Sequence, residues 1–363
     1  MKLIQPRELA RRLALPVLAL AISGCHDAVE VVPLKYAVFG HTENFFDAKF
    51  MGSEVASIAS NGGRLLTING KKVERGGTLE RRAGAETNPQ VARLKFVNDR
   101  LGFGVGQDGA IFHTADAGKT WDRQQSGTEN YLLDVDFVDE NHGWAVGEDS
   151  VTVKTSDGGK SWQKGKVRMS GVGVPGEMAL ALESPTYYSV DFIDDKTGWV
   201  AGEYGQISVT RDGGETWTPQ HGSLLSGKRR DVMFLPSFQC IRFRNAAQGV
   251  AVGTAQGKGD LGGIAFTNDG GETWQFADSP TDAPLYDIAW LPDGKSILVG
   301  SSGEALIGNG ADGWKPLDMP AGTYAALASI DFDPAGRGII AGAHGTLLAS
   351  NDWGKTWDRI ETQ

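Results

Sequence analysis

The chain has 363 residues, of which 50 are glycine, and carries a formal net charge of −10 at pH 7. This acidic balance argues against nucleic acid as a general partner, because phosphate backbones are bound through basic surfaces. Two cysteines in so long a chain argue against a fold held together by a framework of disulfides.

The first 24 residues predict an export signal. A basic segment (residues 2–12) is followed by an apolar stretch (13–22) and by small residues that lead to Cys25. The apolar stretch is too short to span a membrane stably. The pattern is similar to a bacterial lipoprotein signal, in which the cysteine becomes the lipidated N-terminus; the alternative is a secretory peptide with an incidental cysteine. In either case we expect residues 1–24 to be removed and the mature protein to be exported.

The lipoprotein interpretation makes Cys25 the lipidation site and places the protein on the periplasmic face of a bacterial membrane. His26 follows the cysteine in place of an aspartate, which favours the outer membrane, although Asp27 one position later weakens this assignment. Residues 25–50 are expected to form the lipidated N-terminus and a tether that leads into the folded domain.

An eight-residue motif, Ser/Thr-x-Asp-x-Gly-x-Ser/Thr-Trp, recurs five times after residue 110. Its Asp and Trp residues are Asp116 and Trp121, Asp157 and Trp162, Asp212 and Trp217, Asp269 and Trp274, and Asp352 and Trp357. Asn309 and Trp314 keep the same spacing in a degraded copy, and Thr67 to Gly70 is a weaker candidate without the Trp. With Asn309 included, successive copies are 40 to 57 residues apart, a period that predicts a β-propeller with one blade per repeat.

The residues between the boxes predict the strands of each blade. In one unit, residues 132–139 alternate apolar and polar side chains, Gly143 to Gly147 form a short apolar run, and Val151 to Thr155 lead into the box. No segment after residue 25 has sustained helical periodicity. We therefore predict an all-β fold for residues 51–363, a propeller of seven blades with four antiparallel strands each and a box between the third and fourth strands.

The box residues have a structural interpretation. The Asp carboxylate can accept backbone N–H groups of its own turn, the Gly permits positive φ, and the hydroxyl can tie the strand to the turn. The Trp is expected to pack between blades, where burial contributes about 4–6 kcal/mol as an upper bound. A calcium loop would need further carboxylates or amides, but Gly158 to Lys160 follow Asp157. We therefore expect the boxes to be scaffold and predict no metal or cofactor.

Three long segments fall on the face opposite the boxes: residues 163–187, 218–237 and 254–263. They contain seven basic and four acidic residues, among them the run Lys228, Arg229 and Arg230, with apolar residues interleaved. Long loops on one face of a rigid scaffold commonly build a binding surface. The alternative is that they cap the propeller and bury their own apolar side chains, and both can hold together.

The first strand of each blade carries an aromatic residue preceded by a polar or small one. The preceding positions are Lys95, Asp136, Asp191, Arg242, Ala289 and Asp331. Such a ring can border the central channel, where paired carboxylates would suit glycosidase chemistry. We favour an ion network with Lys95 and Arg242, because carboxylates beside cations stay ionised and make poor general acids. Cys240, on one of these strands, is interpreted as a small buried hydrophobe.

Two resemblances follow from these residues. The motif is similar to the Asp-box (BNR) repeat of sialidases, sortilin-type receptors and some endoglucanases, a widespread phrase that says little about activity. The fuller unit, DVDFVDENHGWAVG at Asp134 to Gly147 followed by Thr155 to Trp162, resembles the photosystem II stability and assembly factor family and its bacterial relatives. This resemblance extends from about residue 50 to the C-terminus.

The resemblance implies a propeller that is not an enzyme and that escorts newly made membrane subunits. Members are exported and often lipid-anchored, which Cys25 would match. An arginine-rich patch is associated with partner binding in photosynthetic members, and the residues here that suggest a counterpart are Lys228, Arg229, Arg230, Arg242 and Arg244. We expect the partner to be a membrane protein complex or its subunits, such as a transport or export complex rather than a photosystem.

The main alternative is a sialidase-like glycoside hydrolase. Such enzymes need an arginine cluster, a Tyr nucleophile with a Glu partner, and a Phe/Tyr-Arg-Ile-Pro phrase before the first box. The nearest phrase here, Phe243-Arg244-Asn245, follows the third box and lacks the proline. A propeller that binds glycans or peptides without catalysis is the third possibility that the sequence leaves open.

Overall fold

The computed structural model describes residues 42–52, 54–79, 88–167, 184–220, 223–224, 236–254, 263–310 and 312–361. The chain divides into two compact units, Met1–Tyr36 and Ala37–Gln363, and every described residue belongs to the second. The expected signal peptide, Cys25 and the run Lys228 to Arg230 lie outside the described residues. Within the described ranges, no helix is long and apolar enough to cross a membrane.

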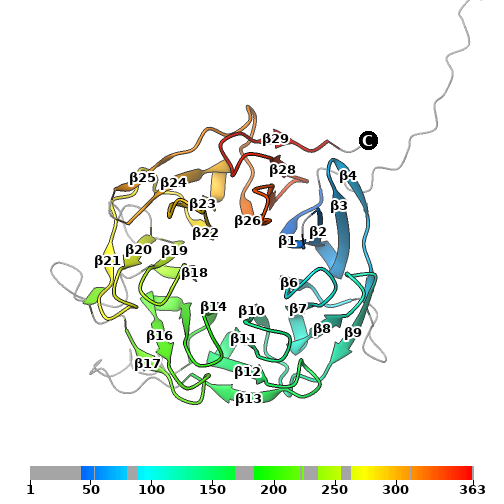
Figure 1. Cartoon of the computed structure of the whole chain (residues 1–363), viewed down its shortest axis with the longest axis vertical. Coiled ribbons are helices and arrows are strands. Elements are labelled where there is room, and N and C mark those ends of the chain that lie inside the picture. Colours follow the sequence, from blue (N-terminus) through cyan, green and yellow to red (C-terminus); the bar gives the residue numbers. More distant parts are fainter. Residues whose placement is uncertain are drawn as a thin grey trace, which may run out of the picture. The chain divides into compact units, whose positions relative to one another are not determined.

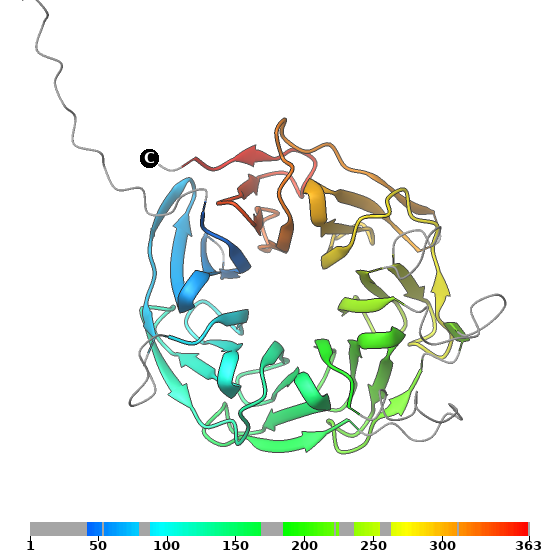
Figure 2. The same ribbon diagram turned by 180° about the vertical axis from the view of Figure 1, so that it is seen from behind.

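The second unit is a seven-bladed β-propeller, as the repeats predicted. Seven sheets stand around a central opening (Figure 1), as the view from behind also shows (Figure 2). In each sheet the four strands of the blade follow one another in chain order from the centre outward, and in blade 2 an additional strand lies outside them. Consecutive strands of each blade pair in antiparallel register.

The strands of the first three blades are β1 (Phe45–Met51), β2 (Val55–Ser60), β3 (Arg64–Asn69) and β4 (Lys72–Arg75); β6 (Val91–Phe96), β7 (Gly102–Gly106), β8 (Ile111–Thr114) and β9 (Thr120–Gln124); and β10 (Leu132–Phe137), β11 (Gly143–Gly147), β12 (Val151–Thr155) and β13 (Gln163–Lys166).

The strands of blades 4 to 7 are β14 (Tyr187–Phe192), β15 (Gly198–Gly202), β16 (Ile207–Thr210) and β17 (Thr218–Pro219); β18 (Ser237–Phe243), β19 (Gly249–Thr254), β20 (Gly263–Thr267) and β21 (Gln275–Phe276); β22 (Leu285–Trp290), β23 (Ser296–Gly300), β24 (Ala305–Asn309) and β25 (Gly313–Pro316); and β26 (Leu327–Phe332), β27 (Gly338–Gly342), β28 (Leu347–Ser350) and β29 (Asp358–Arg359).

The first blade begins at Phe45, not at residue 51 as the sequence suggested. β1 is the inner strand of this blade, and its Phe45 and Ala48 are buried in a cluster with Ile339 and Leu347 of blade 7. The expected tether (25–50) therefore supplies an inner strand at its end. The boundary was misplaced because this blade lacks the box Trp from which the strands of other blades can be counted back.

The second strand of a blade is buried along its whole length in β7, β11, β15, β23 and β27. A continuous apolar run is expected there, because both faces of each sheet pack against neighbouring blades. One such cluster joins Phe103 and Val105 of blade 2 to Leu132, Val135 and Phe137 of blade 3. The hydrophobic core is therefore divided among the blade interfaces.

The box tryptophans pack between blades, which confirms the prediction. Trp217 lies in a cluster with Trp144 of the preceding blade, and its ring meets Phe192 edge-on at 6.1 Å between centroids. Trp144 in turn stacks on Phe192 at 3.6 Å. Trp121 lies in the corresponding cluster with Ala59 of blade 1. Each repeat with an intact box thus packs its own indole against the preceding blade.

The box turn is held by its own side chains, as expected. The Thr155 hydroxyl donates to Asp157 Oδ1 (2.8 Å) and accepts the Gly159 N–H (2.9 Å). Asp157 also accepts the N–H and the hydroxyl of Ser161 at 2.9 and 2.6 Å. Gly158 and Gly159 have φ of 73° and 79°, where a side chain would be strained. The same bonds recur at Asp116, Asp212, Asp269 and Asp352.

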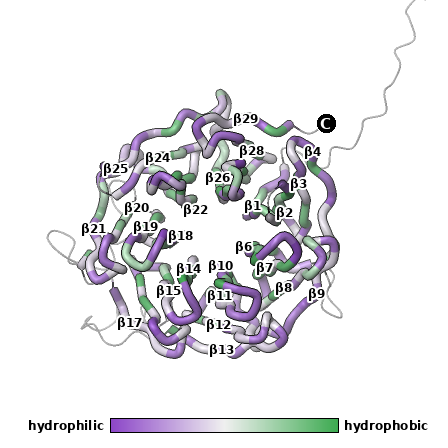
Figure 3. The backbone as a smooth tube through the Cα atoms, in the orientation of Figure 1, coloured by the Kyte–Doolittle hydropathy of each residue, from purple (hydrophilic) through white to green (hydrophobic). Residues whose placement is uncertain are grey.

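The turns segregate onto two faces. The box turns bond to the turns between first and second strands, as in Gly158 N–H to Asn141 O (3.0 Å); we call this side the box face. The turns between second and third strands bond to the crossings between blades, as in Gly205 N–H to Pro236 O (2.8 Å); this is the opposite face. Figure 3 shows hydrophilic residues concentrated in the turns.

Two features were not predicted. β5 (Thr78–Leu79) joins blade 2 as a fifth, parallel strand outside β9, and Leu79 is buried near Trp121. The ring also closes without a strand shared between the first and last blades. Blades 7 and 1 meet through side-chain packing and contacts such as Gly345 N–H to Glu43 O (2.7 Å).

Candidate functional site

The inner strands place a ring of charged side chains around the channel, near the box face. This upper layer consists of Lys49, Lys95, Asp136, Asp191, Arg242, Ala289 and Asp331, and with neighbouring aromatic residues it lines a hollow of about 280 Å³. Six of these positions were aligned from the sequence. Lys49 was missed because its strand was assigned to the tether.

A second layer lies deeper in the channel and was missed altogether. It consists of Asp47, Arg93, Asp134, Ser189, Cys240, Asp287 and Ser329, each 8% exposed or less. The signal was present in the sequence, since every member stands three residues before the aromatic residue used to align the inner strands.

The carboxylates of both layers link each inner strand to the next. In the upper layer Asp136 accepts the Phe192 N–H (2.7 Å) and Asp191 accepts the Phe243 N–H (2.7 Å). In the deeper layer Asp134 accepts the Val190 N–H (3.0 Å). An inner strand has an unpaired edge whose N–H groups need acceptors once buried. These aspartates therefore supply the hydrogen bonds that a further strand would otherwise provide.

Two exceptions in the deeper layer support this interpretation. The side chains of Arg93 and Cys240 do not accept the N–H of the following strand. On the strands that follow them, the N–H groups find acceptors on their own strand: the Val135 N–H bonds to Asp134 Oδ1 (2.9 Å) and the Ile288 N–H bonds to Asp287 Oδ1 (3.0 Å). The Cys240 thiol itself donates to Asp287 at 3.3 Å, and burial raises its pKa to about 12. Cys240 is thus a buried small residue, as expected, with one weak hydrogen bond.

The cations form the ion network that the sequence favoured, with different partners in part. Lys95 Nζ lies 2.6 Å from Asp136 Oδ1, as expected. Arg242 instead reaches the deeper layer, 3.3 Å from Asp134 Oδ2. Arg93 Nη1 lies 3.4 Å from Asp47 Oδ1 and 3.6 Å from Asp287 Oδ2. Lys49 contacts the same two carboxylates at 3.3 and 3.5 Å, so cations join blades that are far apart in sequence.

The pKa values of the network's carboxylates shift in opposite directions, which the sequence-based expectation did not include. Burial, reinforced by the nearby charge of Asp136, raises the pKa of Asp191 to about 7 despite Arg242. Burial likewise raises the pKa of Asp331. Burial opposes ionisation of Asp287 too, but Lys49 and Arg93 overcome it and hold its pKa well below its usual range. Among these three, only Asp287 has close ion pairs with two cations.

The structure separates the two arginines proposed as binding residues. The Arg242 guanidinium lies within the channel and donates to Ser189 Oγ (2.9 Å) and Ile241 O (2.8 Å). Arg244 follows the end of β18, is exposed on the box face, and donates to Pro292 O (3.3 Å). Arg242 is therefore part of the network, whereas Arg244 remains accessible.

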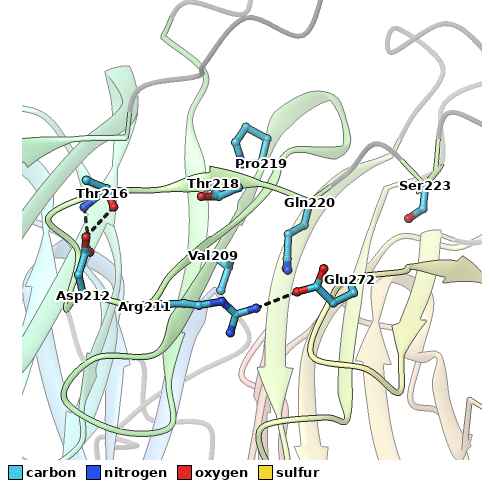
Figure 4. A pocket seen from close by; sticks show the side chains of 10 residues that line it. Val209, Arg211, Asp212, Thr216, Thr218, Pro219, Gln220, Ser223 and Glu272 are labelled. Carbon is cyan, nitrogen blue, oxygen red and sulfur yellow. Dashed lines mark hydrogen bonds and ion pairs between the residues drawn. The ribbon is translucent and has the colours of Figure 1, made fainter.

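A groove of about 570 Å³ lies at the outer rim between blades 4 and 5 (Figure 4). Arg211 and Glu272 form an ion pair across it at 3.0 Å. Gln220 accepts the Trp199 indole N–H (3.1 Å) and donates to Gly270 O (3.2 Å). Its main polar groups bond to one another, so this groove offers a ligand less than its size suggests.

Sequence comparisons identify similar proteins. The model of the family described as "Photosynthesis system II assembly factor YCF48" matches residues 123–173 and 266–363. The chain is 30% identical over 275 residues to the "Photosystem II assembly lipoprotein Ycf48" of Prochlorococcus marinus (strain SARG), covering 73% of this chain and 72% of that protein. It is also 30% identical over 277 residues to the protein of the same name from strain MIT 9312, covering 73% of each.

Comparisons with solved structures agree on the fold. "YCF48 from Cyanidioschyzon merolae" aligns with a TM-score of 0.62 at 20% identity, covering 86% of this chain and 97% of that one. "YCF48 bound to D1 peptide" aligns with a TM-score of 0.55 at 20% identity, covering 78% and 86%. An ancestral GH74 enzyme aligns with a TM-score of 0.65 at 14% identity, covering 88% and 47%. At these identities the likeness concerns the fold alone.

Proposed function

The chain belongs to the Ycf48 family of photosystem II assembly factors, and on this premise we propose that it is a protein-binding scaffold that assists the assembly of a membrane complex. The observation that carries this proposal is the 30% identity to a Ycf48 lipoprotein over 73% of the chain. A solved family member has a D1 peptide bound. By analogy, the partner proposed for this chain is an extended segment of a membrane-protein subunit.

Lipid anchoring is the second part of the proposal. The relatives are named lipoproteins, and Cys25 follows a segment similar to a lipoprotein signal. We propose that Cys25 carries the lipid and holds the propeller at the periplasmic face of a bacterial membrane, with the outer membrane favoured. A surface-tethered scaffold meets membrane subunits at high effective concentration, so modest affinity suffices.

Binding without catalysis is the third part. The upper-layer aspartates each accept a backbone N–H of the next blade, which is a structural use of the groups that a hydrolase would need. Asp191, with its pKa near 7, is the carboxylate best suited to act as a general acid. Hydrolysis of a glycan that Asp191→Asn abolishes, in a variant that folds like the parent, would therefore support the hydrolase alternative.

The experiment that tests the scaffold is site-specific photo-crosslinking with the full chain in its own membranes. A photoreactive residue is placed at Asn268, exposed on the box face, or at Tyr324, 81% exposed on the opposite face. We expect one of these sites to crosslink to the unassembled form of a membrane subunit and not to the mature complex. Equal labelling of many unrelated proteins from both sites would contradict the proposal.

The basic run Lys228 to Arg230 remains a proposed contact with the partner. Reversing its three charges should weaken the crosslink while changing the free energy of unfolding by less than about 0.5 kcal/mol, the usual effect of a substitution outside the core. Lys71, Lys72 and Arg75, exposed on blade 1, are a matched control when reversed together. Equal crosslinking by the two triple variants would remove this run from the binding surface.

A further inference from the structure

The three successive interfaces from blade 2 to blade 5 (2–3, 3–4 and 4–5) share an aromatic packing unit. An aromatic residue of the second strand stacks on the inner-strand aromatic of the next blade, and the box Trp of that next blade meets the latter edge-on. The stacked pairs are Phe103 and Phe137 (3.8 Å), Trp144 and Phe192 (3.6 Å), and Trp199 and Phe243 (3.5 Å). The box tryptophans of these interfaces are Trp162, Trp217 and Trp274. Their ring centroids lie 6.0, 6.1 and 5.9 Å from those of the respective inner-strand aromatics.

The interface between blades 5 and 6 lacks both halves of this unit. Val250 pairs with Arg242 as Trp144 pairs with Asp136, so a valine stands where blades 2, 3 and 4 have an aromatic residue. The box of blade 6 is the degraded copy: its Trp314 bonds to Ser296 Oγ (3.3 Å) within its own blade, and its ring is tilted against Phe266 of blade 5 at 6.4 Å between centroids. Trp290, the inner-strand aromatic of blade 6, is only partly buried.

A hollow of about 220 Å³ results on the box face, and we call it the Arg244 pocket. Its apolar walls are Val250, Phe266 and Trp290. The Trp290 indole N–H is already bonded to Arg242 O (3.2 Å), so the ring presents carbon to the hollow. The pocket is smaller than the roughly 300–1,000 Å³ typical of sites for whole small molecules, and it suits a single side chain.

Arg244 supplies the charge at this pocket. Its guanidinium lies over Gly294, where a Cβ would come within 2.5 Å of Nη1, and it donates to Pro292 O (3.3 Å). The Asp293 carboxylate on the same wall accepts the Lys295 N–H (3.0 Å) and pairs with Lys295 Nζ at 3.1 Å; these contacts and, to a smaller extent, the nearby charge of Arg244 lower its pKa. Among the described residues no carboxylate forms an ion pair with Arg244. The pocket therefore combines an apolar hollow with an accessible, positively charged fork suited to carboxylates.

We propose that the Arg244 pocket binds an extended acidic peptide, with one aromatic or large aliphatic side chain in the hollow and the carboxylate of an adjacent Asp or Glu on Arg244. This inference rests on the proposed function, because it names the chemistry by which the scaffold recognises its partner. Displacement of water from Trp290 and Phe266 provides affinity, and the guanidinium selects sequences with a neighbouring carboxylate.

The test uses the mature chain and short peptides with acetylated and amidated ends, so that no terminal carboxylate is present. Peptides with a central Phe-Asp, Phe-Asn or Ala-Asp pair are compared by titration, with Trp290 fluorescence as one readout. We expect the Phe-Asp peptide to bind at least about tenfold more tightly than either variant peptide, as the loss of a charge-assisted bond or a buried ring implies. Equal binding of Phe-Asp and Phe-Asn peptides would overturn the proposal.

Two variants of the chain complete the test. Val250→Trp fills the hollow with the residue found at the same register in blades 3 and 4, and Arg244→Gln removes the charge without emptying the wall. Each substitution should weaken binding of the Phe-Asp peptide at least about tenfold. Arg211→Gln, at an exposed arginine of the outer groove, should leave this binding unchanged. Should Val250→Trp misfold, Arg244→Gln with an unchanged melting temperature decides alone. If both variants no longer bind the Phe-Asp peptide but still crosslink to the membrane subunit, the proposed function stands and this pocket is not its recognition site.

Discussion

Aspartate has one task in two settings of this protein: it accepts backbone N–H groups that lack another partner. In the exposed box, hydrogen bonds from the hydroxyl and N–H of Ser161 lower the pKa of Asp157 to about 2. In the channel, burial outweighs the hydrogen bond from Phe243, and the pKa of Asp191 rises to about 7. The same residue type therefore responds to pH in opposite directions according to its solvation.

The first prediction concerns Asp191. Its folded pKa lies above the unfolded value of about 3.9, so its contribution to stability is fully present below about pH 4 and is lost as the pH rises to about 7. Asp191→Asn keeps an acceptor for the Phe243 N–H and should remove this dependence, making the variant about 1–3 kcal/mol more stable relative to the parent at pH 8 than at pH 4. Urea unfolding across this range measures the difference.

Asp157→Asn is the control for that experiment. Because the pKa of Asp157 is lowered to about 2, its contribution is present above about pH 4 and is lost as the pH falls toward 2. The difference in the free energy of unfolding between this variant and the parent should therefore change only at acidic pH. A parent-minus-variant curve for Asp191→Asn that is flat from pH 4 to 8 would show that Asp191 is ionised throughout.

The second prediction concerns Trp217. The indole is 9% exposed and its N–H has no hydrogen-bond partner, so its contribution comes from packing against Phe192 and Trp144. Trp217→Ala should cost about 3–5 kcal/mol in the free energy of unfolding, and Trp217→Phe clearly less. For comparison, Trp162→Phe also removes a bond to Gln124 Oε1 (2.8 Å). Melting of Trp217→Ala at the parent temperature would refute interblade packing as the role of the box Trp.

At the scale of the element, the inner strand is the part of the blade that departs most from an ordinary sheet edge. Its edge is buried in the channel, and side chains of the preceding blade replace the missing strand. The positions one and three residues before the inner-strand aromatic serve this purpose wherever they hold an aspartate or a serine. Where cations occupy these positions they neutralise neighbouring carboxylates, so the charges of the channel are shared among blades.

The third prediction separates the hydrogen bond from the ion pair at Asp136. Asp136→Asn removes the charge that faces Lys95 but keeps an acceptor for the Phe192 N–H, whereas Asp136→Ala removes both. The alanine variant should be less stable than the asparagine variant by about 1–3 kcal/mol, the cost of an unsatisfied buried donor. Chemical denaturation of the two variants provides the comparison. Equal stabilities would mean that water replaces the carboxylate at this strand edge.

At the scale of the whole molecule, the ring is closed by non-covalent contacts between blades 7 and 1. Ser329 Oγ donates to Asp47 (2.6 Å), and Asp331 accepts the Phe50 N–H (2.8 Å). Every other interface joins blades that are continuous in the chain, which keeps their strands at high effective concentration. The joint between first and last blades is therefore where the propeller is expected to open.

The fourth prediction tests this joint with matched pairs of substitutions. Ser189 and Asp191 occupy the same two layers in blade 4 as Ser329 and Asp331 in blade 7. Replacing each pair by alanine removes comparable bonds, but only the blade 7 pair should accelerate hydrogen exchange throughout β1 and β26. Similar exchange at the two interfaces would show that closure does not limit the stability of the ring.

Much of the fold could be predicted because it is encoded locally. The box spacing, the buried second strands and the degraded copy at Asn309 each report on a single blade, and together they gave seven blades. The first boundary failed at Phe45 because that blade has no box Trp, and β5 was missed because two residues carry no periodicity. Of the proposed binding residues, Arg242 lies in the channel and Arg244 is exposed outside it, a difference that sequence spacing cannot show.

Repetition in the sequence by itself determined the architecture, because each turn and each strand is specified by neighbours a few residues away. Tertiary structure decided the rest. Asp287 meets Arg93 and Lys49 only because the ring closes, and the pKa of Asp191 depends on burial and on charges brought from other blades. The Arg244 pocket exists because two local losses, Val250 and the degraded box, face each other across one interface. Such effects depend on distances between distant parts of the chain, which a periodic pattern does not contain.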